Sequence, residues 1–234
     1  MTESIWQGIY ITCMALGALL FIAWSRQPRG VPASEYLIAT AIPVWSGLAY
    51  LGLLLGQGTV EVDGQTTYYA RYIDWAVTTP LLLTALALTA MFRQARKNYT
   101  LIGALIFSDL VMIGSGLVAD LSTGSARTVW FLCGVVAFLI VLGLIWGPVR
   151  ALAARDGADL KAVYDKSAGF LSVLWVAYPT IWALGPSGID LLSQPVETAL
   201  FVIVPVLSKV GFSIVDLSGL RGLRAVEAGR AAAV

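Results

Sequence analysis

The chain contains seven apolar runs in succession, and this feature limits its fold more than any other. Each run is long enough to cross most or all of a lipid bilayer as a helix, and the connections leave no room for a soluble domain. Charged residues make up 12% of the chain, about half the share that soluble domains carry. The sequence therefore predicts an all-α membrane protein, a bundle of seven transmembrane helices over residues 5–25, 36–55, 69–91, 99–117, 129–146, 170–185 and 198–215.

We expect one membrane domain over residues 1–220 and a short cytoplasmic tail over residues 221–234. The tail is basic and alanine-rich, which fits either a disordered end or a small docking segment. The first residues, MTES, lack the cationic region and the cleavage site of a signal peptide, so we expect the first run to be retained as a span.

The basic residues indicate how the bundle is oriented, because short cytoplasmic loops of membrane proteins collect Lys and Arg. With the N-terminus outside and the C-terminus inside, twelve of the fifteen basic residues fall on the inner side. The net charge is only +1, so it hides this asymmetry between the two sides. The sequence gives no reason to expect a nucleic-acid partner. The twelve are Arg26, Arg29, Arg93, Arg96, Lys97, Arg150, Arg155, Lys161, Lys166, Arg221, Arg224 and Arg230.

The connection over residues 59–67 lies on the predicted outer side. It alternates residues of high strand propensity around Asp63 and Gly64, a pair that is typical of tight hairpin turns. The sequence therefore predicts a small extracellular β-hairpin between the second and third helices.

Lys209 is the only charge in the seventh run, residues 198–215. A charge at the centre of a bilayer costs about 3 kcal/mol on insertion scales, so such residues usually face the bundle interior and serve a function. The alternative is a lysine that reaches the lipid headgroups, but this requires a position near a helix end, and Lys209 lies well inside its run. Asp216 follows seven residues later, two helical turns or about 10 Å away on the same face.

Arg71 and Asp74 place further charges in the third run, and Thr78 shares their helical face. Asp74 could pair with Arg71 alone. Lys209 also requires an anion, however, because buried charges are costly unless they are paired and hydrogen-bonded. We therefore favour a cluster of Asp74, Arg71 and Lys209. Asp109, in the fourth run, is expected to hydrogen-bond a neighbouring helix rather than to act in transport.

Trp175, Tyr178 and Trp182 repeat at helical spacing in the sixth run. Such a stripe is usually core packing. Because it is expected to face the same interior as Trp75 and Met112, the alternative is a slot for a flat apolar ligand. A lysine in a dry, aromatic-lined pocket is also a candidate nucleophile that can condense with a carbonyl as a Schiff base.

Metal chemistry has no support in the sequence. The chain has no histidine, and Cys13 and Cys133 lie in apolar runs without the spacing of metal ligands. We therefore expect no metal site and read both cysteines as packing residues.

Three motifs resemble those of the microbial rhodopsins: RYxDWxxTTPLLL at residues 71–83, WxxYPxxW at residues 175–182 and SKVGF at residues 208–212. The resemblance implies retinal as cofactor, bound covalently as a Schiff base to Lys209, with Asp74 as counter-ion and proton acceptor. It also implies a protein without enzymatic activity in the prokaryotic plasma membrane, surrounded by lipid and assembled as a homo-oligomer, a trimer. The positions that match the retinal pocket are Trp75, Thr79, Met112, Gly116, Trp175, Tyr178, Trp182 and Pro205.

Two departures from the family pattern indicate the subclass. Outward proton pumps such as bacteriorhodopsin carry a second aspartate four residues before the lysine and a carboxylate on the inner half of helix three, where this chain has Pro205 and Ala85. The proline together with Asp216 is similar to the xenorhodopsin group, which includes inward proton pumps and a cyanobacterial photosensor. Anion pumps are less similar, since they replace the carboxylate of Asp74 with a neutral residue.

The resemblance thus implies a light-driven inward proton pump, with Asp216 as the proton acceptor on the inner side and Arg71 and Glu197 on the outer reprotonation path. The alternative is a photosensory protein that signals through a separate soluble transducer. A light-gated channel would need a continuous polar pore, which the sequence does not show. Polar residues that could line the inner route are Ser46, Thr84 and Ser213.

Overall fold

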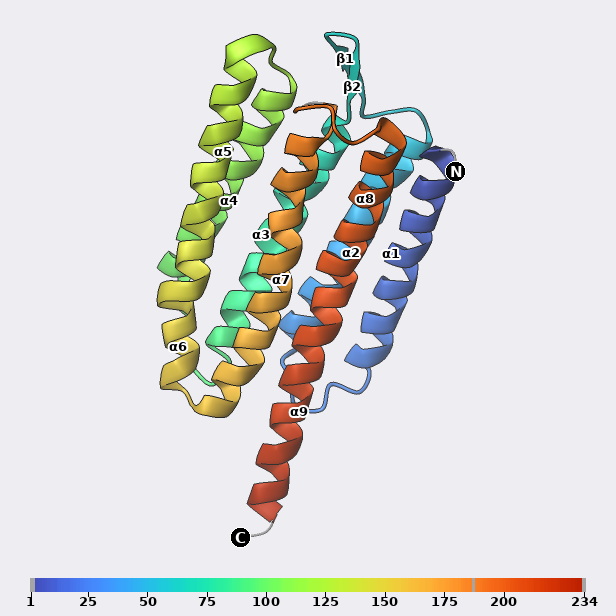
Figure 1. Ribbon diagram of the computed structural model, residues 1–234. Helices are drawn as coiled ribbons and strands as arrows, with labels where there is room; N and C mark the ends of the chain where they lie inside the picture. Colours follow the sequence, from blue (N-terminus) through green and yellow to red (C-terminus); the bar gives the residue numbers. More distant parts are fainter. Residues whose placement is uncertain (1–2, 187, 233–234) are drawn as a thin grey trace.

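The computed structural model describes residues 3–186 and 188–232, and it arranges them as a bundle of long helices (Figure 1). Within these residues, seven helical segments are long and apolar enough to cross a membrane, which confirms the predicted all-α, seven-helix class. The helices are α1 (Glu3–Ser25), α2 (Ala33–Leu54), α3 (Tyr69–Ala90), α4 (Tyr99–Asp120), α5 (Gly124–Leu144), η1 (Ile145–Val149), α6 (Arg150–Arg155), α7 (Ala158–Leu184), α8 (Gln194–Val206), η2 (Leu207–Gly211) and α9 (Phe212–Ala232).

A small hairpin projects from one end of the bundle (Figure 1), as predicted. Strand β1 (Val60–Val62) pairs antiparallel with β2 (Gln65–Thr67). The two residues between the strands, Asp63 and Gly64, have φ values of 55° and 74°. Two consecutive positive φ values define the turn whose twist matches paired strands, and Asp-Gly is a favoured sequence for it.

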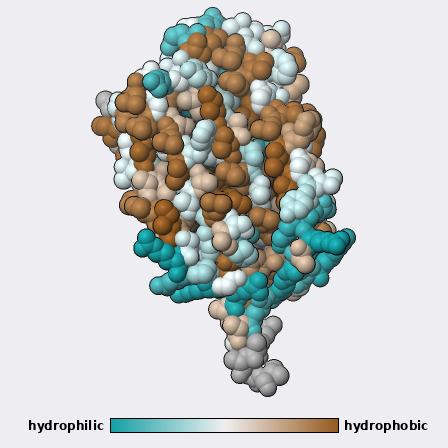
Figure 2. Space-filling model, turned by 180° about the vertical axis from the view of Figure 1, so that it is seen from behind, coloured by the Kyte–Doolittle hydropathy of each residue, from teal (hydrophilic) through white to brown (hydrophobic). Residues whose placement is uncertain are grey.

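The outer surface of the bundle is apolar, as a bilayer requires. Large hydrophobic side chains point away from the core, including Phe107 on α4, which is 71% exposed, and Val173 on α7, which is 73% exposed. Exposed apolar area of this extent marks a surface that lipid covers. Figure 2 shows this hydrophobic middle and a gathering of hydrophilic residues at the end from which α9 leaves the bundle.

The fifth span is longer than predicted. We predicted it over residues 129–146, ending before Pro148, but the helical path continues through η1 and α6 to Arg155. The reason is a π-helical turn around Pro148, which absorbs the missing backbone donor. The hydroxyl of Tyr164 donates a hydrogen bond of 2.7 Å to the carbonyl oxygen of Ile145 and so satisfies one acceptor of this turn.

The seventh span contains a second π-helical turn, η2, and Lys209 lies in it, one turn after Pro205. A π turn fits one extra residue into the helix, so the helical faces before and after it are rotated relative to a regular helix. The span then continues as α9 through Ala232, beyond the ends of the other helices (Figure 1). The expected tail at residues 221–234 therefore begins as part of this helix, and residues 233–234 lie outside the described part of the chain.

Candidate functional site

Lys209 and Asp74 form an ion pair at the centre of the bundle, as predicted. The Lys209 amine contacts the Oδ2 atom of Asp74, and the two residues are 1% and 0% exposed. The pair joins η2 to α3. Because the cation and the anion are both removed from solvent, each charge compensates the cost of burying the other.

Two hydroxyl groups complete the surroundings of the amine. The Lys209 Nζ atom donates to Ser46 Oγ at 2.8 Å and to Tyr10 Oη at 3.2 Å. Ser46 in turn donates to Asp74 Oδ2 at 2.9 Å. Sequence analysis missed Tyr10 and assigned Ser46 to the inner route, whereas the structure places Ser46 against the ion pair. A phenol and a hydroxyl inside apolar runs were the available signal, since buried polar groups need partners.

Arg71 is not part of this cluster, which corrects the expectation of a group of three. Among the described residues, none of the ion pairs includes Arg71. Its guanidinium lies over the rings of Tyr68 and Phe201, 4.1 Å and 4.8 Å from their centroids. Aromatic faces attract cations of this kind, so the guanidinium is held there while the carboxylate of Asp74 turns to the lysine.

A small polar cavity lies on the hairpin side of the ion pair. It brings Arg71 together with Glu197, the second residue that we placed on the outer path. Asp120, at the end of α4, also lines it. Two carboxyl groups and a guanidinium therefore share one enclosed space next to the central site.

The central cavity is apolar and lies between α3, α4, α5 and α7, with Lys209 in its wall. All but one of the predicted pocket residues line this cavity. The exception is Pro205, which lies in α8, before the π-helical turn that holds Lys209. The predicted residues that line it are Trp75, Thr79, Met112, Gly116, Trp175, Tyr178 and Trp182, with Lys209 in the wall. Residues that sequence analysis did not assign to it are Tyr72, Leu82, Ile113, Phe131, Gly134, Val135, Phe138, Pro179, Phe201 and Ser208.

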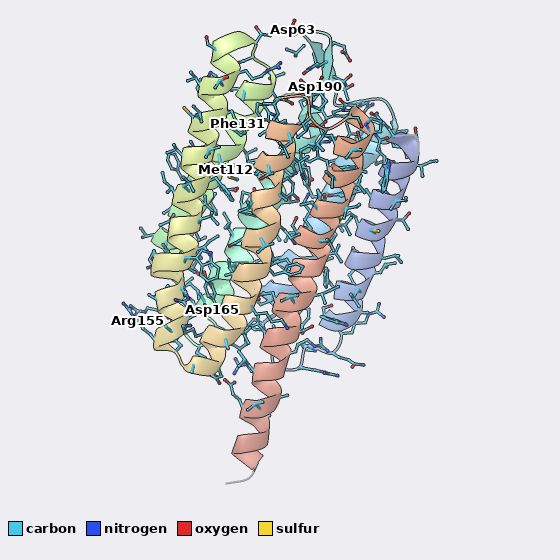
Figure 3. The ribbon with its side chains drawn as sticks, in the orientation of Figure 1. Asp63, Met112, Phe131, Arg155, Asp165 and Asp190 are labelled. Atoms are coloured by element: carbon cyan, nitrogen blue, oxygen red, sulfur yellow. The ribbon has the colours of Figure 1, made fainter. Side chains whose placement is uncertain are left out.

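Aromatic rings shape this cavity. Trp75 and Tyr178 meet edge to face with centroids 5.4 Å apart, and Phe131 stacks on Trp182 at 4.4 Å. Figure 3 labels Phe131 on α5 and, near it, Met112 on α4. A side chain at Gly116 would lie 3.3 Å from the Tyr72 ring, so glycine keeps this wall open. These contacts create a narrow space suited to a flat apolar molecule.

Asp109 forms a bond between helices, as expected. The hydroxyl of Thr79 on α3 donates to Asp109 Oδ2 on α4 at 2.6 Å. Asp109 is fully buried and its Oδ1 atom has no partner among the described residues. It therefore supports a pocket residue, Thr79, without touching Lys209.

Asp216 lies in α9, toward the end of the bundle opposite the hairpin, and is 2% exposed. The Thr89 hydroxyl on α3 lies 3.0 and 2.9 Å from its two carboxylate oxygens. Among the described residues, none of the ion pairs includes Asp216. Between Asp216 and the central pair, Ala85 packs in the hydrophobic core and provides no carboxylate.

Glu35 is a further acidic residue at this end; it directly precedes the span predicted over residues 36–55, and the sequence assigned it no role. It is buried, its Oε2 atom has no hydrogen-bond partner among the described residues, and its charge interacts with that of Asp216. Lys97, between α3 and α4, also interacts with Glu35, although burial lowers the pKa of the Lys97 amine. Carboxylates near the start of a helix commonly interact with its free N–H groups at the surface, so the sequence did not indicate that Glu35 is buried.

A seven-helix membrane bundle with one buried lysine, one partner carboxylate and an aromatic cavity defines a chromophore-binding membrane protein. The model of the bacteriorhodopsin-like protein family matches residues 1–223, and the chain belongs to this family, the microbial rhodopsins. Members of the family bind retinal through a Schiff base with a lysine, and they are light-driven pumps or sensors rather than enzymes.

Three similar proteins illustrate the match. Archaerhodopsin-2 from Halobacterium sp. (strain aus-2) is 36% identical, over 92% of this chain and 84% of the relative. Sensory rhodopsin-2 from Natronomonas pharaonis is 33% identical, over 96% of this chain and 91% of the relative. The crystal structure of thermophilic rhodopsin from Rubrobacter xylanophilus is 34% identical and has a TM-score of 0.87, covering 93% of this chain and 96% of that chain. The protein is therefore a multi-pass membrane protein of this fold.

The residues present fit retinal. The cavity wall is almost entirely apolar, Lys209 provides the amine, and the indole nitrogen of Trp75 is buried without a partner among the described residues. A polyene chain presents no donors or acceptors, so an apolar aromatic slot is the environment that it requires.

Proposed function

We propose that this protein is a light-driven inward proton pump, similar to the xenorhodopsins, with retinal bound covalently to Lys209. The observation that carries the proposal is the position of Asp216. This carboxylate is buried on the α9 side of Lys209 and is hydrogen-bonded to a hydroxyl instead of being paired with a cation. A carboxylate of this kind is available to accept a proton.

The proposed orientation puts the hairpin outside and α9 inside. Basic residues of several connections gather at the α9 end, among them Arg93, Lys97 and Arg155, and Figure 2 shows the hydrophilic rim there. An excess of Lys and Arg is typical of the cytoplasmic side. With this orientation, the cavity of Arg71 and Glu197 faces the outside and Asp216 faces the cytoplasm.

On the outer side of Lys209, we assign to Asp74 the role of counter-ion. It is already the ion-pair partner of the amine, and Ser46 donates to the same carboxylate oxygen. Retinal, when bound, supplies light absorption and the change of shape that follows. Arg71 and Glu197 share the adjacent polar cavity, which makes them the candidates to conduct protons from outside.

On the inner side, the residues favour release rather than uptake. The helix-three position that carries a proton-donating carboxylate in outward pumps is Ala85, which packs in the hydrophobic core. Asp216 and then Glu35 are the acidic groups that lead toward the cytoplasm. Thr84 contributes less than expected to this route, because its hydroxyl donates to the carbonyl of Pro80 in its own helix.

The test is the direction of light-driven pH change. Cells or liposomes that contain the protein are illuminated, and the external pH is recorded with and without a protonophore. We expect alkalinisation outside cells that the protonophore abolishes. Acidification would assign an outward pump, and Lys209→Ala, which cannot form the Schiff base, is the control for pH changes of other origin.

The alternative is a photosensor that signals through a separate soluble transducer. It is favoured by the similarity to a sensory rhodopsin and by the extension of α9, where Glu227 forms an ion pair with Arg93 beyond the bundle. A normal photocycle without any pH change would support it.

Assembly as a trimer and a cytoplasmic role for residues 221–234 belong to the same proposal. Size-exclusion chromatography with light scattering tests the first. A chain truncated after Leu220 tests the second, because a membrane domain over residues 1–220 predicts unchanged colour and pumping.

A further inference from the structure

We propose that Tyr10, on the first helix, is a positioning residue for the counter-ion Asp74, and that it acts through the hydroxyl of Ser46. The inference rests on the proposed attachment of retinal to Lys209. It does not depend on the direction of proton transport.

The position of the Tyr10 phenol is fixed from two sides. The residue is fully buried, and its oxygen lies 2.6 Å from Ser46 Oγ and 3.2 Å from Lys209 Nζ. Its ring stacks on that of Tyr50, with centroids 3.7 Å apart. Tyr50 is held in turn, because its hydroxyl donates to the carbonyl oxygen of Phe201 at 2.7 Å. A ring that is held by packing keeps its hydroxyl in one place.

The number of protons in the group determines whether Tyr10 or Ser46 is the donor in their mutual hydrogen bond. The hydroxyl of Ser46 has one proton, and it goes to Asp74 Oδ2. The short contact between Tyr10 and Ser46 therefore uses the proton of Tyr10. The lysine ammonium has three N–H donors, and Tyr10, Ser46 and Asp74 accept them. Every proton in this group has an acceptor.

Attachment of retinal changes this count. The nitrogen of a protonated Schiff base has one N–H, so two of the three acceptors lose the donor that the lysine ammonium gave them. Tyr10 and Ser46 keep their own protons and remain satisfied by the chain from Tyr10 to Ser46 to Asp74. Asp74 has no proton to give, so the remaining N–H is best used by Asp74.

The relay of two hydroxyls thus supplies Asp74 with a donor that does not depend on the lysine. Pro205 occupies the position of the second carboxylate of outward pumps, so at this position no further carboxylate competes with Asp74 for the N–H. Ser46 orients the carboxylate, and Tyr10 orients Ser46.

The experiment compares Tyr10→Phe, Ser46→Ala and the double variant in the retinal-loaded protein. The readouts are the absorption maximum and the infrared carboxylate bands of Asp74. Loss of a donor concentrates negative charge on Asp74, so both single variants should absorb at shorter wavelength, Ser46→Ala more strongly. Because Tyr10 acts through Ser46, the double variant should match Ser46→Ala. Ser46→Thr, which keeps the hydroxyl, should resemble the unmodified protein.

Thr12→Val is the matched control, since this hydroxyl on the same helix donates only to the carbonyl oxygen of Gly8. Unchanged spectra in Tyr10→Phe, or a double variant whose shift is the sum of the single shifts, would overturn the relay. If Tyr10→Phe does not accumulate, the C–O band of ring-deuterated tyrosine in Ser46→Ala decides, because the relay requires it to move. A wrong attachment site is recognised separately, by mapping the borohydride-reduced retinal adduct.

Discussion

The hydroxyl of Thr89 bridges both carboxylate oxygens of Asp216, at 3.0 and 2.9 Å, and so links the last turns of α3 to α9. Both residues are buried, and neither lines the retinal cavity. A buried carboxylate without a cation partner depends on its hydroxyl donors, because burial without hydrogen bonds is costly for a charged group.

Thr89→Val should therefore change proton release without changing colour. Valine has a similar shape and lacks the hydroxyl, so we expect a slower late photocycle and a smaller light-driven pH signal, with the resting absorption maximum unchanged. Flash photolysis with a pH-indicator dye measures both. Thr84→Val is the matched control, since that hydroxyl bonds within its own helix; equal effects in the two variants would argue against a specific role of Thr89.

Lys209→Ala should give a colourless protein after retinal is added, because the buried amine is the only attachment point that the cavity offers among the described residues. The measurement is visible absorbance after reconstitution. Lys97→Ala, which changes a lysine between α3 and α4, should keep its colour. Visible absorbance in Lys209→Ala, with the reduced adduct at another residue, would falsify the assignment.

Asp74→Asn should shift the absorption maximum to longer wavelength. The negative charge of Asp74 stabilises the positive charge of the ground-state Schiff base, and an amide removes that charge. Absorption spectra recorded across a pH titration provide the test. Asp109→Asn alters a buried carboxyl group that contacts Thr79 instead of Lys209, so its shift should be smaller. A spectrum of Asp74→Asn that equals that of the unmodified protein at every pH contradicts the counter-ion role.

The seven spans and the pairing of Lys209 with Asp74 could be predicted from the sequence, because both follow from the cost of polar groups in lipid. The course of the chain at Pro148 could not. A proline often ends a helix, and here a π-helical turn carries the helix past it, held by a hydrogen bond from Tyr164 of a different helix.

The same limit explains the misplaced side chains of the site. Arg71 shares a helical face with Asp74, but the rings of Tyr68 and Phe201 hold it elsewhere. Tyr10 reaches Lys209 from the other end of the sequence. Contacts of this kind arise from the packing of distant helices, which spacing along one helix does not encode.

Tyr164→Phe should destabilise the protein by about 1 kcal/mol, because it removes a buried hydrogen bond to the carbonyl of Ile145 in η1. Thermal unfolding of the purified protein in detergent, followed by loss of visible absorbance, measures the effect. In the control Thr180→Val, an exposed hydroxyl that bonds within α7 is lost, and little change is expected. Equal melting temperatures for Tyr164→Phe and the unmodified protein would show that other groups satisfy the carbonyl.

Asp216→Asn should slow or abolish the inward proton signal and leave the colour nearly unchanged, because the carboxylate lies outside the retinal cavity and is hydrogen-bonded to Thr89 rather than to a cavity residue. An amide cannot accept the proton that leaves the Schiff base, whereas Asp74 remains in place as counter-ion. The matched control is Asp165→Asn, an aspartate at the same end (Figure 3) that pairs with Arg150 and Lys161. External pH under illumination should rise in the control and stay level in Asp216→Asn. If Asp216→Asn pumps inward at the full rate, the proton takes a route without this residue, and Glu35, the next buried carboxylate, becomes the group to test.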